Sequence, residues 1–145
     1  ELICPSEYIA AFRRFSACDD PLPETGLSSL TIARSTGRYS GRAPAIAYGH
    51  GNGTDRRQWL PVAVAVHEAG FAQLLFDFTG RGESDGEVIS LGWHEAGDLR
   101  AALDALAARP EIDPLRLALG GRSMGAAAAP SRRNPPSCRR VKRTA

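Results

Sequence analysis

The stretch LALGGRSMG, Leu117–Gly125, decides the fold that this sequence predicts. An apolar run ends at two glycines, a serine follows shortly after, and a further glycine leads into the alanines of Ala126–Ala129. A short apolar run bounded by glycine is typical of a buried strand, whereas alanine is the best helix former. The pattern therefore predicts a strand over Leu115–Gly120, a sharp turn at Ser123 and a helix after it.

Two further strands and two helices precede this turn. The apolar runs PAIAYGHG (Pro44–Gly51) and AQLLFDF (Ala72–Phe78) predict buried strands that end in loops. Helices are expected over Asp55–Ala69, which Gly70 ends, and from Trp93 to a stop at Pro110. Strands that alternate with helices at this spacing indicate a parallel sheet with helices on both faces. The predicted apolar faces comprise Trp59, Val62, Ala63 and Val66 in the first helix and Trp93, Ala96, Leu99, Leu103 and Leu106 in the second.

The chain divides into three segments. Residues 1–40 give weak signals, with a short helix around Tyr8–Phe15 and a strand at Ser29–Arg34, and residues 41–129 hold the α/β core. Residues 130–145 carry six basic side chains and no acidic one, so the net charge of +2 divides into +6 for this tail and −4 for residues 1–129.

Composition limits the functional classes. With 145 residues, 43% hydrophobic and 23% charged, the chain is typical of one soluble globular domain. No apolar run is long enough to span a membrane and the first residues do not resemble a signal peptide, so we expect a cytoplasmic protein. The odd, widely spaced cysteines Cys4, Cys18 and Cys138 argue against a metal site or a disulfide framework, and no cofactor is expected.

The glycine-rich loops do not fit nucleotide-binding motifs. A G-x-G-x-x-G pattern that starts at Gly49 meets Thr54 at its last position, and one that starts at Gly80 meets Asp85. A phosphate-binding P-loop needs a lysine, and Lys142 in the tail is the only lysine in the sequence. Gly121–Gly125 fits G-x-S-x-G, in which a strained strand-to-helix turn exposes the serine hydroxyl; a glycine-rich turn with an incidental serine is the alternative.

Three motifs in order resemble the first half of an α/β-hydrolase. They are HGNG at His50–Gly53, DFTGRGES at Asp77–Ser84 and GRSMG at Gly121–Gly125, each placed at the end of a predicted strand. The middle motif is similar to the D-x-R-G-x-G-x-S turn of that superfamily, with Thr79 where arginine is common. The sequence most resembles serine hydrolases of the esterase, acyl-peptidase and dienelactone-hydrolase branches, which implies a three-layer parallel α/β fold.

The resemblance also implies roles for individual residues. Ser123 would be the nucleophile, and the backbone amides of Asn52 and Met124 would form the oxyanion hole. Supporting positions are His50, which in this motif steadies the loop and is not the base, with Gly51, Gly121 and Gly125. The implied substrate is a small-molecule carboxylic ester, thioester or amide cleaved through an acyl-enzyme.

The catalytic acid and base have no counterpart here. In this fold they follow the serine, and after Ser123 the sequence contains no Asp, Glu or His. His67 and His94 are expected at the surface or at an element boundary. We therefore expect a partial hydrolase that is inactive alone and whose last predicted strand, with an unpaired edge, favours self-association.

Two explanations of the tail stay open. Residues 130–145 belong to a shifted reading frame of a fragment, or they form a native disordered basic tail. Under the second, the chain is a non-catalytic adaptor that binds a partner or a polyanion through the tail, although no aromatic signature favours nucleic acid.

Overall fold

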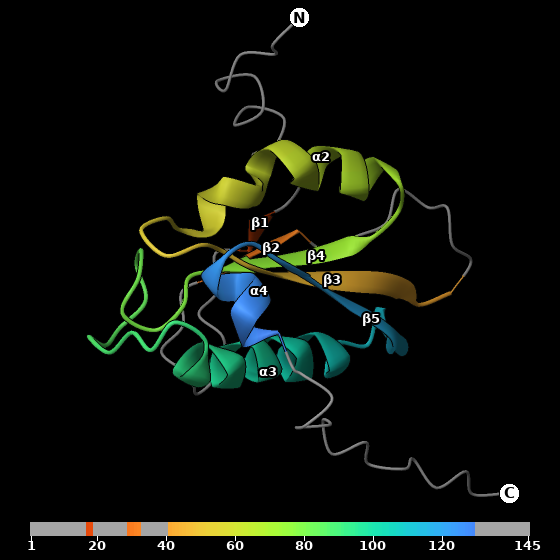
Figure 1. Cartoon of the computed structure of the whole chain (residues 1–145). Helices are drawn as coiled ribbons and strands as arrows, with labels where there is room; N and C mark the ends of the chain where they lie inside the picture. The colour runs from red at the N-terminus through yellow and green to blue at the C-terminus, as the bar shows by residue number, and fades with distance from the viewer. Residues whose placement is uncertain (1–16, 19–28, 33–40, 130–145) are drawn as a thin grey trace, which may run out of the picture.

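A five-stranded sheet forms the centre of the computed structural model, which describes residues 17–18, 29–32 and 41–129 (Figure 1). The strand order is β1-β2-β4-β3-β5. The strands are β1 (Ala17–Cys18), β2 (Ser29–Ile32), β3 (Ala43–Gly49), β4 (Ala72–Phe76) and β5 (Ile112–Gly121). Predictions on residues 1–16 and on the tail 130–145 lie outside the described residues.

The parallel part of the sheet confirms the predicted fold class. β3 lies between β4 and β5 and pairs in parallel with both, with Tyr48 opposite Leu75 on one side and Gly120 on the other. β2 adds to β4 in the antiparallel sense. Because parallel strands end at one edge, the loops after β3, β4 and β5 meet there, where open α/β sheets bind their ligands.

Helices cover both faces of the sheet. A 3₁₀ turn, η1 (Arg56–Trp59), leads into α2 (Leu60–Glu68) on one face, and α3 (Trp93–Ala107) and α4 (Met124–Ala128) lie on the other (Figure 1). Side chains alternate along a strand, so each strand serves both layers. The larger core joins Leu74 and Phe76 of β4 to Leu99, Leu106 and Met124, and the smaller core, under α2, is formed by Tyr48, Leu75 and Ala63.

The helix that begins after Asp55 differs from the prediction. Its first turn, η1, is 3₁₀ and not α; Asp55 caps it by accepting the Arg57 N–H, and Pro61 sits at the start of α2. The buried residues of α2 are Ala63 and His67, which lie one helical turn apart. His67, expected at the surface or at an element boundary, lies in the last turn of α2 but is buried, and Val62, expected in the core, is 44% exposed.

One further prediction of burial needs correction. Trp93 was expected on the apolar face of α3 but is 83% exposed, because the helix begins at this residue and turns Leu99, Ala102 and Leu106 to the sheet. His94 lies exposed in the first turn of α3, as predicted.

β5 begins earlier than predicted and is irregular. Ile112 pairs with Ala43, but the next pair on β3, Ala45, faces Leu117. The residues between include Pro114, which has no N–H to donate, and Leu115, which is 90% exposed. Within the described residues β5 is the outermost strand on its side, and self-association through this edge stays a prediction.

Candidate active site

Ser123 lies between the end of β5 and the start of α4 and has a strained backbone. Its φ of 52° and ψ of −115° fall outside the regions that L-residues favour. Such a conformation costs about 1–3 kcal/mol and persists only where the surroundings impose it. Ser123 is exposed at the edge of the sheet where the three parallel strands end.

Close packing of the backbone explains the glycines on either side of Ser123. A Cβ added at Gly121 would lie 2.6 Å from the carbonyl oxygen of Gly125, and a Cβ at Gly125 would lie 2.1 Å from the carbonyl oxygen of Gly49. Real Cβ atoms do not approach backbone this closely. Gly121 is therefore required by close packing within the turn and Gly125 by packing of the turn against β3, so the spacing of the two glycines is not an accident of composition.

Two hydrogen bonds join the turn to the loop after β3. The Arg122 N–H donates to the Gly49 carbonyl oxygen at 3.2 Å, and the Gly125 N–H donates to the His50 carbonyl oxygen at 3.1 Å. The fold thus brings together the HGNG and GRSMG motifs, which are some seventy positions apart in the printed sequence.

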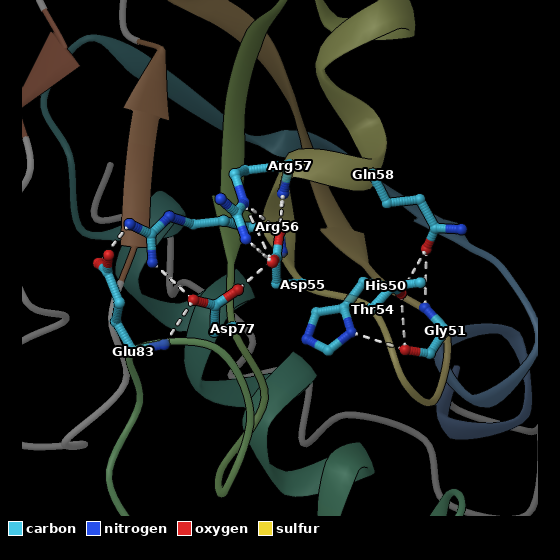
Figure 2. Close-up of polar contacts among 9 residues, drawn as sticks. All are labelled: His50, Gly51, Thr54, Asp55, Arg56, Arg57, Gln58, Asp77 and Glu83. Carbon is cyan, nitrogen blue, oxygen red and sulfur yellow. Dashed lines mark hydrogen bonds and ion pairs between the residues drawn. The ribbon is translucent and has the colours of Figure 1, made fainter.

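His50 is fully buried, and both nitrogens of its ring contact backbone groups. Nε2 accepts the Phe78 N–H at 3.1 Å, so the ring proton resides on Nδ1, which donates to the Gly51 carbonyl oxygen at 2.9 Å (Figure 2). The ring also packs on that of Phe78, with centroids 4.8 Å apart. His50 therefore links the loop after β3 to the end of β4, and its ring nitrogens are engaged in doing so.

The loop 51–54 folds onto η1 through polar contacts that sequence reasoning missed. The Gln58 amide oxygen accepts the Gly51 N–H at 2.8 Å, and the Thr54 hydroxyl lies 2.8 Å from the Gly51 carbonyl oxygen (Figure 2). Gly53 takes a φ of 78°, which favours glycine, and completes the turn. Asn52 lies exposed at its tip.

Asp77 organises the turn after β4. Its buried carboxylate accepts the Arg56 N–H and the Arg56 guanidinium, each at 2.6 Å, and the Glu83 N–H at 3.0 Å (Figure 2). The same guanidinium contacts the Glu83 carboxylate at 2.6 Å. A Cβ at Gly82 would lie 2.1 Å from an oxygen of Asp77, so only glycine fits there. The buried charge is thus compensated by an ion pair and by backbone donors.

Two side chains of the same turn reach neighbouring elements. Thr79 contacts the Asp98 carboxylate of α3 through its N–H at 2.9 Å and its hydroxyl at 3.1 Å, and burial raises the pKa of Asp98. The Arg81 guanidinium donates to the side-chain oxygen of Asn52, across from the loop after β3. The three loops at this edge are therefore connected to one another.

The candidate residues named from the sequence lie in two neighbouring segments, the loop after β3 and the turn that joins β5 to α4. The first segment holds His50, Gly51 and Asn52, and the second holds Gly121, Ser123, Met124 and Gly125. Their catalytic roles stay predictions. Gln58, Arg56 and Arg81 were missed, because each acts through a partner distant in sequence; the Asp that opens the middle motif was the one available signal. Within the described residues no group of His, Cys, Asp and Glu could hold a metal ion, and no helix there could cross a membrane.

Solved structures that resemble this chain include α/β-hydrolases and esterases. The chain resembles the α/β-hydrolase GrgF from Penicillium with a TM-score of 0.59 and 28% identity, over 68% of this chain and 34% of that one. It resembles the Pyrococcus furiosus esterase Pf2001 with a TM-score of 0.64 and 24% identity, over 88% of this chain and 49% of that one. Over the aligned part, the protein is related to the α/β-hydrolase superfamily.

Curated relatives are longer than this chain. An uncharacterized protein of Mycobacterium tuberculosis is 40% identical over 89 residues, which are 61% of this chain and 31% of the relative. The uncharacterized protein YfhR of Escherichia coli is 29% identical over 123 residues, 85% of this chain and 41% of the relative. The chain thus spans less than half the length of these relatives. No family model matches the sequence.

Proposed function

We propose that this protein carries the nucleophile of a serine hydrolase that cleaves a carboxylic ester, thioester or amide. The observation that carries the proposal is the conformation of Ser123, at a φ of 52° between two glycines that close backbone contacts require. Strain at a solvent-exposed serine has no benefit for stability, and strained residues cluster where chemistry needs a fixed geometry. The hydrolase and esterase neighbours support the same class of reaction.

In the proposed reaction the Ser123 Oγ attacks the carbonyl carbon of the substrate and the carbonyl oxygen becomes an oxyanion. Backbone N–H groups are suitable donors for this charge, since they need no reorganisation. The Met124 N–H, in the first turn of α4, has no acceptor within its own helix, and we assign it as one donor. The Asn52 N–H is assigned as the other, because the Gly51 N–H already donates to Gln58.

The attack also needs a base that removes the hydroxyl proton. His50 is unsuited, since its Nε2 accepts from Phe78 and its Nδ1 donates to Gly51. The sequence has no Asp, Glu or His after Ser123, and the curated relatives extend well beyond the matched region. We therefore propose that the acid and the base of the whole enzyme come from outside these 145 residues.

Imidazole added to the solution provides a test, because it can replace a missing histidine as the base. The chain alone should hydrolyse a nitrophenyl ester no faster than its Ser123→Ala variant, since the residual contributions of the site are small without a base. With added imidazole and a fluorophosphonate probe, Ser123 should be modified in the folded chain, as peptide mass mapping would show. Urea-unfolded chain is the control for nonspecific labelling.

Two results would defeat the proposal. One is labelling that is spread over many serines, and the other is labelling that persists in Ser123→Ala. Salt-dependent binding of a polyanion, combined with no labelling at all, would instead favour the adaptor role of the basic tail.

A further inference from the structure

Arg81 has a placement that ion pairing does not explain. Its guanidinium donates to the Asn52 side-chain oxygen, and its Nε is buried with no hydrogen-bond partner. A buried donor without an acceptor costs roughly 1–3 kcal/mol. No carboxylate contacts this guanidinium in the ion pairs of the described residues, whereas Arg56, nearby, contacts two. The side chain is therefore not placed there for its charge pairing.

The backbone that carries Arg81 is tightly fixed. The Arg81 N–H donates to the Phe78 carbonyl oxygen at 2.9 Å, and the Arg81 carbonyl oxygen accepts the Ser84 N–H at 2.9 Å. Gly80 and Gly82 on either side have φ values of 71° and 55°, and Gly82 packs against Asp77. The guanidinium thus extends from a rigid turn.

The residue that it contacts lies at the exposed tip of its loop. Asn52 is exposed, and it lies between Gly51 and Gly53. Glycine has unusual backbone freedom, so the backbone on both sides of Asn52 can move easily. At the base of the loop, His50 connects to Phe78, and Gly51 is held by Gln58. At the tip, the contact from Arg81 connects the side chain of Asn52 to the turn after β4.

We propose that Arg81 is a positioning residue that fixes the Asn52 peptide unit and thereby the second oxyanion donor. The inference rests on the proposed function, since it concerns the same site. An amide that swings freely must be ordered at the moment of reaction, and a misplacement of about 1 Å can slow a reaction on the order of 100-fold. Arg81 acts before the reaction starts, through the Asn52 side chain, and does not contact the reacting atoms.

A double-mutant cycle tests this directly. Arg81→Met keeps the length of the side chain and removes its donors, and Asn52→Ala removes the acceptor but keeps the backbone N–H. Each change should slow the imidazole-assisted phosphonylation of Ser123 about 10-fold or more, in the limiting rate and not in the half-saturating probe concentration. The double variant should be no slower than either single one, because both remove the same contact.

Controls separate positioning from stability and from charge. Arg81→Lys keeps one flexible donor group and should recover part of the rate. Arg109→Met removes a positive charge at the far end of α3, where Arg109 pairs with Glu111, and should leave the rate unchanged. No variant should have a thermal midpoint below that of the native chain, whereas a purely structural role for Arg81 predicts a loss in Arg81→Met.

Hydrogen exchange of the amides in residues 51–54 tests the contact without any chemistry at Ser123. The exchange rates should rise several-fold in Arg81→Met and in Asn52→Ala and should be unchanged in Arg109→Met. Unchanged exchange in Arg81→Met, or additive rate losses in the cycle, would overturn the positioning role. Faster exchange in Arg81→Met and Asn52→Ala, combined with a native chain whose Ser123 is never labelled, would support the contact and refute the proposed function.

Discussion

Replacing Gly125 by alanine should destabilise the protein, although alanine is normally the better helix residue. Gly125 is the second residue of α4, where helix propensity alone predicts a gain of about 1 kcal/mol. The new Cβ, however, would lie 2.1 Å from the carbonyl oxygen of Gly49 and 2.4 Å from its carbonyl carbon. These are backbone atoms of a buried strand, so no side-chain rotation relieves the contact. Overpacking a rigid site costs about 1–3 kcal/mol or more, and the clash here favours the upper end.

Urea unfolding followed by circular dichroism measures the outcome. The free energy of unfolding of Gly125→Ala should fall by about 2 kcal/mol, since the strain exceeds the gain in propensity. Gly97→Ala is the matched control: Gly97 lies within α3, and a Cβ there meets nothing within 4 Å. That variant should be more stable by about 0.5–1 kcal/mol. Gly125→Ala with native or higher stability would refute the packing argument.

Three further predictions concern Ser123, Arg56 and Glu95. Ser123→Gly should raise the free energy of unfolding by about 1 kcal/mol, since glycine adopts a positive φ without strain, whereas Ser123→Ala should not raise it. Equal stabilities of the two variants in urea would count against backbone strain at this residue. Arg56→Met should lower the free energy of unfolding by about 2 kcal/mol or more, because the Asp77 carboxylate stays buried without its cation. Arg109→Met, which removes one partner of an exposed ion pair, should change the free energy of unfolding little. Burial alone would raise the pKa of Glu95, but hydrogen bonds from Ser90 and the Gly92 N–H outweigh it and lower the pKa to about 2. The stabilisation by Glu95 is therefore complete above pH 4.5 and is lost as the pH falls toward 2. Glu95→Gln should therefore be less stable than the native chain at pH 7, and its stability should depend less on pH between pH 4.5 and about 2. Acid-unfolding curves of the variant and the native chain that run parallel would contradict this.

The sequence predicts the core of this fold well because local patterns determine it. The apolar run through Ala45 and Ala47 is buried on both faces in a central parallel strand, and such strands read as continuous hydrophobic stretches. The G-x-S-x-G pattern predicts the turn at Ser123, and the steric requirement at Gly121 acts against Gly125, a few positions further along the chain. Leu99 and Leu106 recur at helical steps and lie in the core as expected.

What the sequence leaves open depends on contacts between distant segments. Nothing near Arg56 indicates that its partner is Asp77, and nothing near Asn52 indicates that Arg81 reaches it. The burial of His67 does not follow from the apolar pattern either, because a histidine adds nothing to the hydrophobic period and its burial depends on how α2 packs.

Gly49 has a consequence for where the chain can be altered. A Cβ there would lie 2.8 Å from the Phe78 ring and 3.1 Å from the Gly125 Cα, so segments from β3, the end of β4 and α4 meet at one residue. A peptide inserted between Gly49 and Gly51 would separate all three. The stretch around Glu87 and Val88 is exposed and outside any helix or strand, and exposed loop tips accept insertions. Reporter tags and epitope insertions should therefore be tolerated after Glu87 while the strained turn at Ser123 keeps its shape.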